Sequence, residues 1–235
     1  MEGFVVSDLH LFSDRSSGED YFPELTHKAR SVSAIVLNGD TFDLAWTNRA
    51  SAVAAAQEGV ALIERLARNN PSCHVFYIVG NHDCSETLIS GLCDLAKRYS
   101  NVSVHEEYLQ LGDKLFVHGD VCNYSMSAAE LGVLRQQYAQ VVLRPRWLKA
   151  LYKLVILFRL NRVAYMTHNP ETMAERILSY LGNSYPELLN SARFIYYGHT
   201  HAPSEYHHTS GVTFINTGST IRGMKHNFQA FSYEK

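Results

Sequence analysis

The sequence predicts an α/β sandwich. Short apolar runs alternate with stretches of helical periodicity along most of the chain, and this alternation is typical of layered folds built from strands and helices. Short polar motifs follow several of the apolar runs directly, at the places where strands are expected to end. The chain has 235 residues, of which 46% are hydrophobic, so it is long for one domain and can bury a sizeable core.

The first half of the chain alternates between strands and helices. The apolar runs Gly3–Ser7 and Ala34–Leu37 predict the first two strands. Ala50–Arg68 is rich in alanine, with apolar positions at helical spacing, and Asn69-Asn70-Pro71 ends this helix. The pattern continues with a strand at His74–Val79, a helix around Glu86–Arg98, and a hairpin in which Tyr108–Leu111 and Lys114–His118 flank Gly112-Asp113.

The middle of the chain has a different character. No Asp or Glu occurs from Leu131 to Pro170, a stretch that holds seven Arg and Lys residues. Apolar spacing predicts three helices there, at Leu131–Val142, Trp147–Leu160 and Glu171–Leu181. We therefore expect a helical cap insertion at about residues 123–190 that covers the active site, within a single domain that spans residues 1–235.

Strand patterns return after this insertion. Arg193–Tyr197 predicts a strand, a hairpin turns near Ser210-Gly211, and Asn227–Tyr233 predicts the last strand. The turn that contains Asn216, together with the nearby Arg222, could approach a bound phosphate, and a purely structural turn explains the same residues equally well.

Composition excludes several classes of protein. The net charge of −2 gives no sign of nucleic-acid binding, and the four Cys residues contain no Cys-x-x-Cys pair, which argues against a zinc ribbon and a disulfide framework and fits a reducing cytoplasm. The N-terminus does not resemble a signal peptide, because it lacks a basic segment and reaches Asp8 early. The most apolar stretch, Leu154–Phe158, is five residues long, far below the roughly 20 that span a bilayer. We expect a cytoplasmic protein that could still touch the inner membrane as a peripheral protein.

Five short motifs follow predicted strands and carry groups that bind metals. They are Asp8-Leu9-His10, Gly39-Asp40, Gly80-Asn81-His82-Asp83, His118-Gly119-Asp120 and Gly198-His199-Thr200-His201. Ligands of layered α/β folds bind beyond the carboxyl ends of strands, so we expect the motifs to meet there. Carboxylates mixed with imidazoles suit divalent cations such as Mn²⁺ or Fe²⁺. A carboxylate that bridges two cations holds them ~3.5–4 Å apart, a spacing used to activate water for attack at phosphorus. The motifs predict a dimetal site for phosphate ester chemistry.

In order and spacing, the motifs resemble those of the calcineurin-like metallophosphoesterase superfamily, which run D-x-H, GD-x-x-D, GNH[D/E], H and GH-x-H. The resemblance covers the chain except the insertion, and it implies two mixed β-sheets packed face to face and flanked by helices. It also implies two sets of metal ligands that share Asp40. The first set is Asp8, His10, Asp40 and His201, and the second is Asp40, Asn81, His118 and His199.

The resemblance gives His82 a catalytic role beside the bound phosphate, as a general acid or a stabiliser of the transition state. A histidine suits this role because its pKa lies near neutrality, so that it can protonate a leaving alkoxide. Asp83 is expected to hydrogen-bond His82 or another imidazole and to fix its tautomer. Asp43, the last residue of the GD-x-x-D motif, is expected to support the site in a similar way.

One branch of the superfamily is more similar than the rest. Bacterial UDP-2,3-diacylglucosamine pyrophosphatases of lipid A synthesis share the motifs at Asp8–Leu11, Gly39–Phe42 and His118–Asp120. They also carry a basic and apolar helical cap, which Arg146-Trp147-Leu148 resembles. This similarity implies a lipid-linked nucleotide sugar as substrate, cleaved to lipid X and UMP. The chain departs from the branch at His82, where the branch commonly has Arg.

Several functions remain open from the sequence. The first is a dimetal hydrolase that cleaves a phosphate ester or pyrophosphate bond with metal-activated water, with two Mn²⁺ ions expected and Fe²⁺, Zn²⁺ or Mg²⁺ as alternatives. A phosphodiesterase or phosphatase for nucleotides or proteins is the second, favoured by His82 and disfavoured by the cap. A scaffold without activity is disfavoured by the complete ligand set. The basic cap could contact lipid or membrane, serve only as structure, or bind a second subunit.

Overall fold

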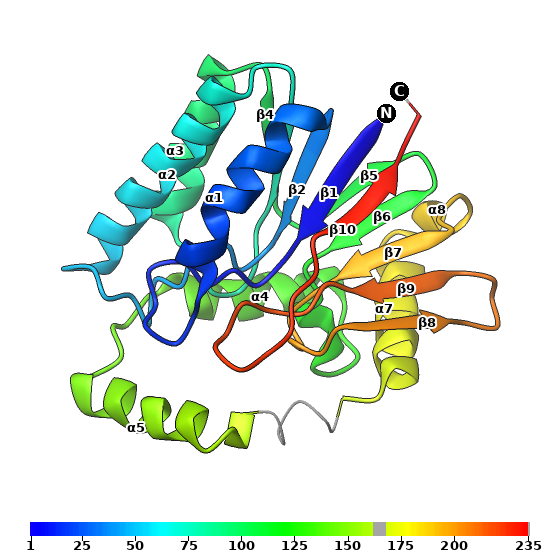
Figure 1. Ribbon diagram of the computed structural model, residues 1–235. Coiled ribbons are helices and arrows are strands. Elements are labelled where there is room, and N and C mark those ends of the chain that lie inside the picture. The colour runs from blue at the N-terminus through cyan, green and yellow to red at the C-terminus, as the bar shows by residue number, and fades with distance from the viewer. Residues whose placement is uncertain (162–167, 235) are drawn as a thin grey trace.

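The fold consists of two five-stranded β-sheets flanked by helices, as Figure 1 shows for the computed structural model. The structure describes residues 1–161 and 168–234. The strand orders are β10-β1-β2-β3-β4 in the first sheet and β5-β6-β7-β9-β8 in the second. Both sheets contain parallel and antiparallel pairs. The expected sandwich of two mixed sheets is confirmed.

The first sheet is built around three parallel strands that come early in the chain. These are β1 (Glu2–Val6), β2 (Ala34–Asn38) and β3 (His74–Ile78), and β4 (Val102–His105) pairs parallel with the last of them. The final strand, β10 (Gln229–Ser232), runs antiparallel beside β1, so the two ends of the chain lie together. Every residue of β2 is buried, as expected for a central parallel strand covered on both faces.

The second sheet combines two hairpins with a parallel centre. β5 (Tyr108–Leu111) and β6 (Lys114–Val117) form the first hairpin, and β8 (Ser204–His207) pairs antiparallel with β9 (Thr213–Asn216) in the second. β7 (Phe194–Tyr197) lies parallel between β6 and β9. Gly112 and Gly211, in the two hairpin turns, have φ values of 61° and 86°, which glycine adopts without a steric penalty. Both expected hairpins are confirmed.

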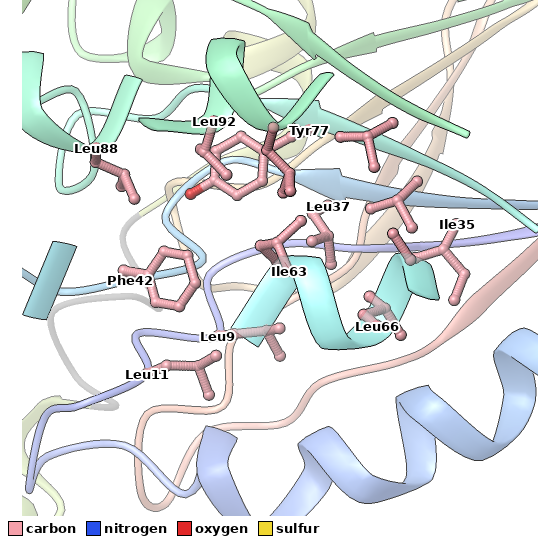
Figure 2. Packing of buried hydrophobic residues seen from close by; sticks show 14 of the residues in the cluster. Leu9, Leu11, Ile35, Leu37, Phe42, Ile63, Leu66, Tyr77, Leu88 and Leu92 are labelled. Carbon is pink, nitrogen blue, oxygen red and sulfur yellow. The ribbon is translucent and has the colours of Figure 1, made fainter. Parts of the chain in front are cut away.

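Helices cover the outer face of the first sheet. They are α1 (Gly18–Lys28), which η1 (Ala29–Ser31) extends, α2 (Ala52–Asn69) and α3 (Glu86–Arg98). Ser51 and Ser85 cap α2 and α3, since each side chain accepts a backbone N–H of the first turn. Figure 2 shows Ile63 of α2, Leu92 of α3 and Leu37 of the sheet within one core cluster.

The apolar residues on the inner faces of the two sheets form a separate core cluster, which includes Val36 from the first sheet and Phe116 from the second. On the outer side of the second sheet lie η2 (Asp120–Cys122), α4 (Ala128–Ala139), α7 (Pro170–Ser184) and α8 (Pro186–Leu189). Their buried side chains form one core cluster with that sheet, as Ile177 of α7 and Ile195 of β7 do. Three helices of the expected cap region, α4, α7 and α8, thus contribute to the core of the sandwich.

The helix α5 (Arg146–Leu157) lies at the edge of the molecule, below the sheets in Figure 1, and none of its residues is buried. It contacts the loop after β2, where Lys149 Nζ donates to the Thr47 carbonyl at 2.5 Å and the Tyr152 ring lies 5.2 Å from the Trp46 ring. Within the described residues, no helix has the length and apolar character needed to cross a membrane.

Among the elements that were not predicted from the sequence are the helix α1 and the strand β4. The helix α1 contains Pro23, and a proline within a helix removes one backbone hydrogen bond and normally ends or kinks the helix. The strand β4 is four residues long, too short for a clear alternating pattern. Neither element supplies a residue of the expected site.

Candidate metal centre

The five motifs meet because their strands end at the same edge of the two sheets. Asp8 lies two residues beyond β1, Asp40 two residues beyond β2, and Asn81 three residues beyond β3. His118 follows β6 directly, and His199 lies two residues beyond β7. In parallel strands the carboxyl ends face the same way. Loops that are far apart in the sequence therefore form one cluster of polar side chains.

One group of possible ligands combines Asp8, His10 and His201. The Nε2 atoms of His10 and His201 lie 3.1 Å apart. Oδ1 of Asp8 lies 3.0 Å from Nε2 of His201 and 3.7 Å from Nε2 of His10. The three side chains are buried, and their nitrogen and oxygen atoms face a common point.

A second group combines Asp40, His118 and His199. Oδ1 of Asp40 lies 3.4 Å from Nε2 of His118. Asn81 belongs to this group as well, because its Oδ1 lies 3.2 Å from Nε2 of His118 and 3.0 Å from Nδ1 of His199. The other carboxylate oxygen of Asp40, Oδ2, lies 3.9 Å from Nε2 of His10. Asp40 thus faces both groups, one with each oxygen.

These two groups fit divalent cations. Bond lengths of 2.0–2.2 Å from a metal to nitrogen or oxygen place neighbouring ligand atoms roughly 3–3.5 Å apart, which is the spacing between His10 and His201. Oδ1 of Asp8 is buried and has no hydrogen bond within the part of the chain that the structure describes, although a buried carboxylate oxygen normally has a partner. A cation between these atoms would satisfy both the carboxylate oxygen and the two imidazole nitrogens.

The backbone adopts the left-handed conformation at most of these residues. The φ values are 52° for Asp8, 45° for His10, 51° for Asp40, 63° for His199 and 56° for His201. This region costs an ordinary L-residue roughly 1–2 kcal/mol, and such residues cluster at functional sites. Hydrogen bonds between the loops hold the conformation, since the backbone N–H of His10 donates to the Asp40 carbonyl at 2.9 Å.

Glycines in the motifs make room for the neighbouring side chains. A Cβ atom on Gly39 would lie 2.2 Å from Nδ1 of His118, and Gly39 itself has a φ of 82°. A Cβ atom on Gly198 would lie 2.2 Å from Oδ2 of Asp8. Any larger residue would displace His118 or Asp8 from its group.

Partners outside the two groups orient two of the imidazole rings. Nδ1 of His118 lies 3.2 Å from the carbonyl oxygen of Asn38, which can only accept, so Nδ1 carries the proton and Nε2 is free to bind a metal. In His199 the two ring nitrogens have the opposite roles. Nε2 lies 3.0 Å from Oδ1 of Asn123, outside the group, and Nδ1 faces Asn81 within it. Sequence patterns gave no indication of Asn123, which lies outside every motif.

His82 lies at the edge of the two groups and is paired with Asp43. Its Nδ1 is 3.1 Å from Oδ1 of Asp43, its backbone N–H donates to Asp40 Oδ1 at 2.8 Å, and its ring packs against the edge of His10 with centroids 4.9 Å apart. The side chain is 24% exposed, so substrate can reach it. His82, His10 and Asp40 form a third set of atoms close enough to hold a metal.

The expected contact between Asp83 and an imidazole is not made. The carboxylate of Asp83 accepts the backbone N–H groups of Thr41 and Gly80, at 2.8 and 2.7 Å, and the hydroxyl of Tyr77 at 2.7 Å. Burial raises the pKa of Asp83 to about 7. Asp83 holds the loops after β2 and β3 together, and Asp43 is the residue that orients His82.

Charges within the site shift the pKa values in opposite directions. Burial opposes ionisation of Asp40, but the imidazoles of His118 and His82 outweigh it and hold the pKa of Asp40 well below its usual value. Burial disfavours the imidazolium of His118, yet the carboxylate of Asp40 raises the pKa of His118 to about 10. Burial lowers the pKa of His199 to about 4. A proton on His118 would be released when a metal binds in its place.

The turn that contains Asn216 is hydrogen-bonded to the loop after β7, which carries two of the expected ligands. Nδ2 of Asn216 donates to the Gly198 carbonyl at 3.0 Å and to the Thr200 hydroxyl at 2.9 Å. Nε of Arg222 donates to the Asp14 carbonyl at 3.2 Å. Of the two interpretations of Asn216, the structural one matches these contacts, because the residue is buried and bonded to the loop that carries His199 and His201.

Comparison with known proteins identifies the family. The model of the calcineurin-like phosphoesterase family matches residues 4–203, and the chain belongs to this family. No curated protein matches the chain. Among solved structures, a dimetal phosphatase from Danio rerio is 13% identical, with a TM-score of 0.52 over 94% of this chain and 88% of that chain. Another solved chain is 13% identical, with a TM-score of 0.50 over 99% of both chains.

A phosphopantetheinyl hydrolase from Mycobacterium tuberculosis is 14% identical, with a TM-score of 0.43 over 93% of this chain and 89% of that chain. At such identities the two solved structures with TM-scores of 0.52 and 0.50 support the fold alone, and the family match supports the enzyme class. The chain is a metal-dependent phosphoesterase, and its clustered His and Asp side chains suit a dimetal site. The expected superfamily and enzyme class are confirmed, and the branch within the superfamily stays a prediction.

Proposed function

We propose that this protein is a phosphodiesterase or phosphatase with two divalent metal ions, expected to be Mn²⁺. The ligands of one ion are Asp8, His10, Asp40 and His201, and those of the other are Asp40, Asn81, His118 and His199. The observation that carries the proposal is the position of Asp40, whose Oδ2 faces His10 at 3.9 Å while its Oδ1 faces His118 at 3.4 Å. A carboxylate between two ligand groups is the arrangement that a bridging ligand requires.

The protein side chains around the ions have separate tasks. Bound cations would supply Lewis-acid chemistry, which neutralises phosphoryl oxygens and lowers the pKa of a water molecule. His82 donates a proton to the leaving oxygen, and Asp43, which accepts a hydrogen bond from Nδ1, stabilises the imidazolium that holds this proton. Asn81 offers a neutral oxygen as a ligand, and Asp8 and Asp40 are the two acidic ligands. Two divalent cations would therefore leave the site with a net positive charge that attracts phosphate.

The first test is hydrolysis of bis-p-nitrophenyl phosphate and p-nitrophenyl phosphate by purified protein loaded with Mn²⁺. We expect turnover of at least one ester that disappears after chelation and returns with Mn²⁺. Metal content measured by mass spectrometry should approach two ions per chain. Absence of turnover on both esters with two bound ions would contradict the proposal and favour an inactive scaffold.

A lipid-linked nucleotide sugar, such as UDP-2,3-diacylglucosamine, is the second candidate substrate. The observation in its favour is the outward face of α5, where Trp147, Leu151, Leu154 and Leu157 are 68%, 50%, 50% and 70% exposed. These residues recur at helical spacing, so they form one apolar stripe. No Asp or Glu occurs between Leu131 and Pro170. An apolar stripe flanked by Arg and Lys suits acyl chains and an anionic membrane surface.

Two measurements separate the candidates. Faster release of UMP from UDP-2,3-diacylglucosamine than of nitrophenol from the synthetic diester would favour the lipid substrate. Leu154→Ser combined with Leu157→Ser should then raise KM for the lipid and weaken binding to phosphatidylglycerol vesicles. Val53→Ser is the control, because Val53 is 51% exposed on α2. If the double variant binds vesicles as wild type does, α5 is not a lipid-binding surface.

A further inference from the structure

Asp43 lies between two imidazoles of the site. Its Oδ1 is 3.1 Å from Nδ1 of His82 and its Oδ2 is 3.7 Å from Nδ1 of His10. Only the first contact is a hydrogen bond, and Nδ1 of His10 has no hydrogen bond among the described residues. The two distances differ little, so a small rotation of the carboxylate would bring Oδ2 within hydrogen-bond distance of His10 and draw Oδ1 away from His82. Some other group must therefore hold Asp43 toward His82.

Arg15 is placed to do this. Its Nε and Nη2 both donate to Oδ2 of Asp43, at 2.9 and 2.6 Å. These bonds occupy the oxygen that faces His10 and leave Oδ1 for His82. The backbone N–H of Trp46 also donates to Oδ1, at 3.2 Å. Charge-assisted bonds of this kind are stronger than neutral ones and fix the orientation of a carboxylate.

Aromatic side chains hold the guanidinium in place. The Cζ atom of Arg15 lies 4.6 Å from the centroid of the Trp46 ring and 5.4 Å from that of Tyr152. Tyr152 belongs to α5, which also contacts the neighbouring loop through Lys153, whose Nζ lies 3.0 Å from Asp14 Oδ2. A guanidinium over an aromatic ring is stabilised by the electrons of the ring. The docked helix α5 thus closes one side of the Arg15 site.

We propose that Arg15 is a positioning residue, which acts through Asp43 to keep His82 oriented for proton donation, and that Tyr152 on α5 holds Arg15 in place. This inference rests on the proposed role of His82 as the proton donor. Arg15 is nearly buried, with a side-chain exposure of 10%, and its hydrogen bonds to Asp43 connect it to His82 through that carboxylate. Its loss should therefore affect the chemical step more than substrate binding.

The test uses two esters that differ only in their leaving group, methyl p-nitrophenyl phosphate and methyl phenyl phosphate. The poorer leaving group, phenol, depends more on proton donation. We expect Arg15→Gln to lower kcat for the phenyl ester roughly tenfold to hundredfold, a part of the roughly hundredfold or larger factor that general acid catalysis contributes. The kcat for the nitrophenyl ester should change little, and KM and the metal content should stay as in wild type.

Arg49→Gln is the matched control. Arg49 also pairs with carboxylates, Glu58 and Glu19, and stacks on an aromatic ring, with Cζ 4.3 Å from the Phe12 centroid. It has no bond to Asp43 or His82 among the described contacts, so its loss should leave the ratio of the two ester rates unchanged. Arg15→Lys keeps the charge but not the two-pronged geometry, and we expect an intermediate rate. It also serves as the test if Arg15→Gln does not fold.

A double-mutant cycle with His82→Ala identifies the route of the effect. If Arg15 acts through His82, Arg15→Gln should have no further effect on kcat in the His82→Ala background. Additive losses, equal losses on both esters, or a rise in KM alone would overturn the inference, because they indicate a general structural role or direct substrate binding. A different result would contradict the proposed function itself, namely that the wild type loaded with Mn²⁺ hydrolyses neither ester. Tyr152→Leu should reproduce part of the Arg15→Gln effect, and an unchanged ester ratio would remove α5 from the proposal.

Discussion

Asn38 and His118 connect the two sheets directly beside the metal centre. Nδ1 of His118 donates to the carbonyl oxygen of Asn38 at 3.2 Å. The side chain of Asn38 extends from the first sheet to the second, where its Nδ2 donates to the carbonyls of Val117 and Tyr196 at 3.0 and 3.3 Å. One residue at the end of β2 therefore orients a proposed ligand and satisfies the backbone of β6 and β7.

Replacing Asn38 by alanine should destabilise the fold and loosen the site. The carbonyls of Val117 and Tyr196 would lose their donor in a buried position, which costs roughly 1–3 kcal/mol. Urea denaturation of the metal-free protein measures this loss. Asn48→Ala is the control, because Asn48 is exposed and bonds to Asp14 at the surface. Equal stabilities of the two variants would show that the contacts across the sheets contribute little.

Gly80 tests how closely the loops pack around the proposed bridging ligand. A Cβ atom there would lie 2.3 Å from Oδ1 of Asp40 and 2.4 Å from its backbone nitrogen. Since the backbone cannot move aside cheaply, Gly80→Ala should lower metal content and cost roughly 1–3 kcal/mol of stability. Gly132→Ala is a control in the helix α4, where nothing lies within 4 Å. This control should leave metal content unchanged, whereas full metal loading of Gly80→Ala would contradict the close packing.

Two substitutions separate metal binding from proton donation. Asp40→Ala removes the carboxylate that faces both ligand groups, so we expect loss of metal and loss of activity together. His82→Ala removes the proposed proton donor and should lower kcat roughly a hundredfold or more while both ions remain bound. Metal analysis and turnover of the same preparations check both results. If His82→Ala lost its metal, His82 would be a ligand, in agreement with its place beside His10 and Asp40.

Patterns along the chain predict the strand ends, and strand ends determine which motifs meet. This explains why Asp8, Asp40 and His118 could be grouped from the sequence, since each follows a short apolar run. The sequence also predicts α5 as a helix. Its orientation was not predictable, because helical periodicity shows which residues share a face and not which face is covered. The apolar stripe with Trp147 and Leu154 lies outward, opposite to the usual expectation.

Contacts within the loops were harder to predict. Asp43 and Asp83 are both acidic residues of the motifs that meet at His82. Only the folded chain shows that Asp43 hydrogen-bonds the imidazole of His82, while Asp83 accepts hydrogen bonds from backbone N–H groups. Arg15 and Asn123 lie outside the motifs, and their roles depend on the packing of α5 and η2 beside the site. A residue pattern carries no information on such pairings, because they arise from tertiary contacts between loops.

The buried ion pair between Asp120 and Arg135 holds the helix α4 against the segment that follows His118. Nε and Nη2 of Arg135 donate to the two carboxylate oxygens of Asp120, at 2.8 and 3.1 Å, and the side chains are 11% and 2% exposed. Arg135→Met would leave the buried carboxylate without its cation, which typically costs roughly 3–5 kcal/mol. Urea denaturation should show this loss.

Asp120→Asn combined with Arg135→Met should recover part of that stability, because the double variant removes the uncompensated charge as well. The control is Lys97→Met, which breaks an exposed pair with Asp94 at 2.9 Å and should leave the urea midpoint unchanged. A double variant that is less stable than Arg135→Met alone would mean that Asp120 acts through its other neighbours. In that case the loss on Arg135→Met would reflect the lost packing of the Arg135 side chain and not the charge of Asp120.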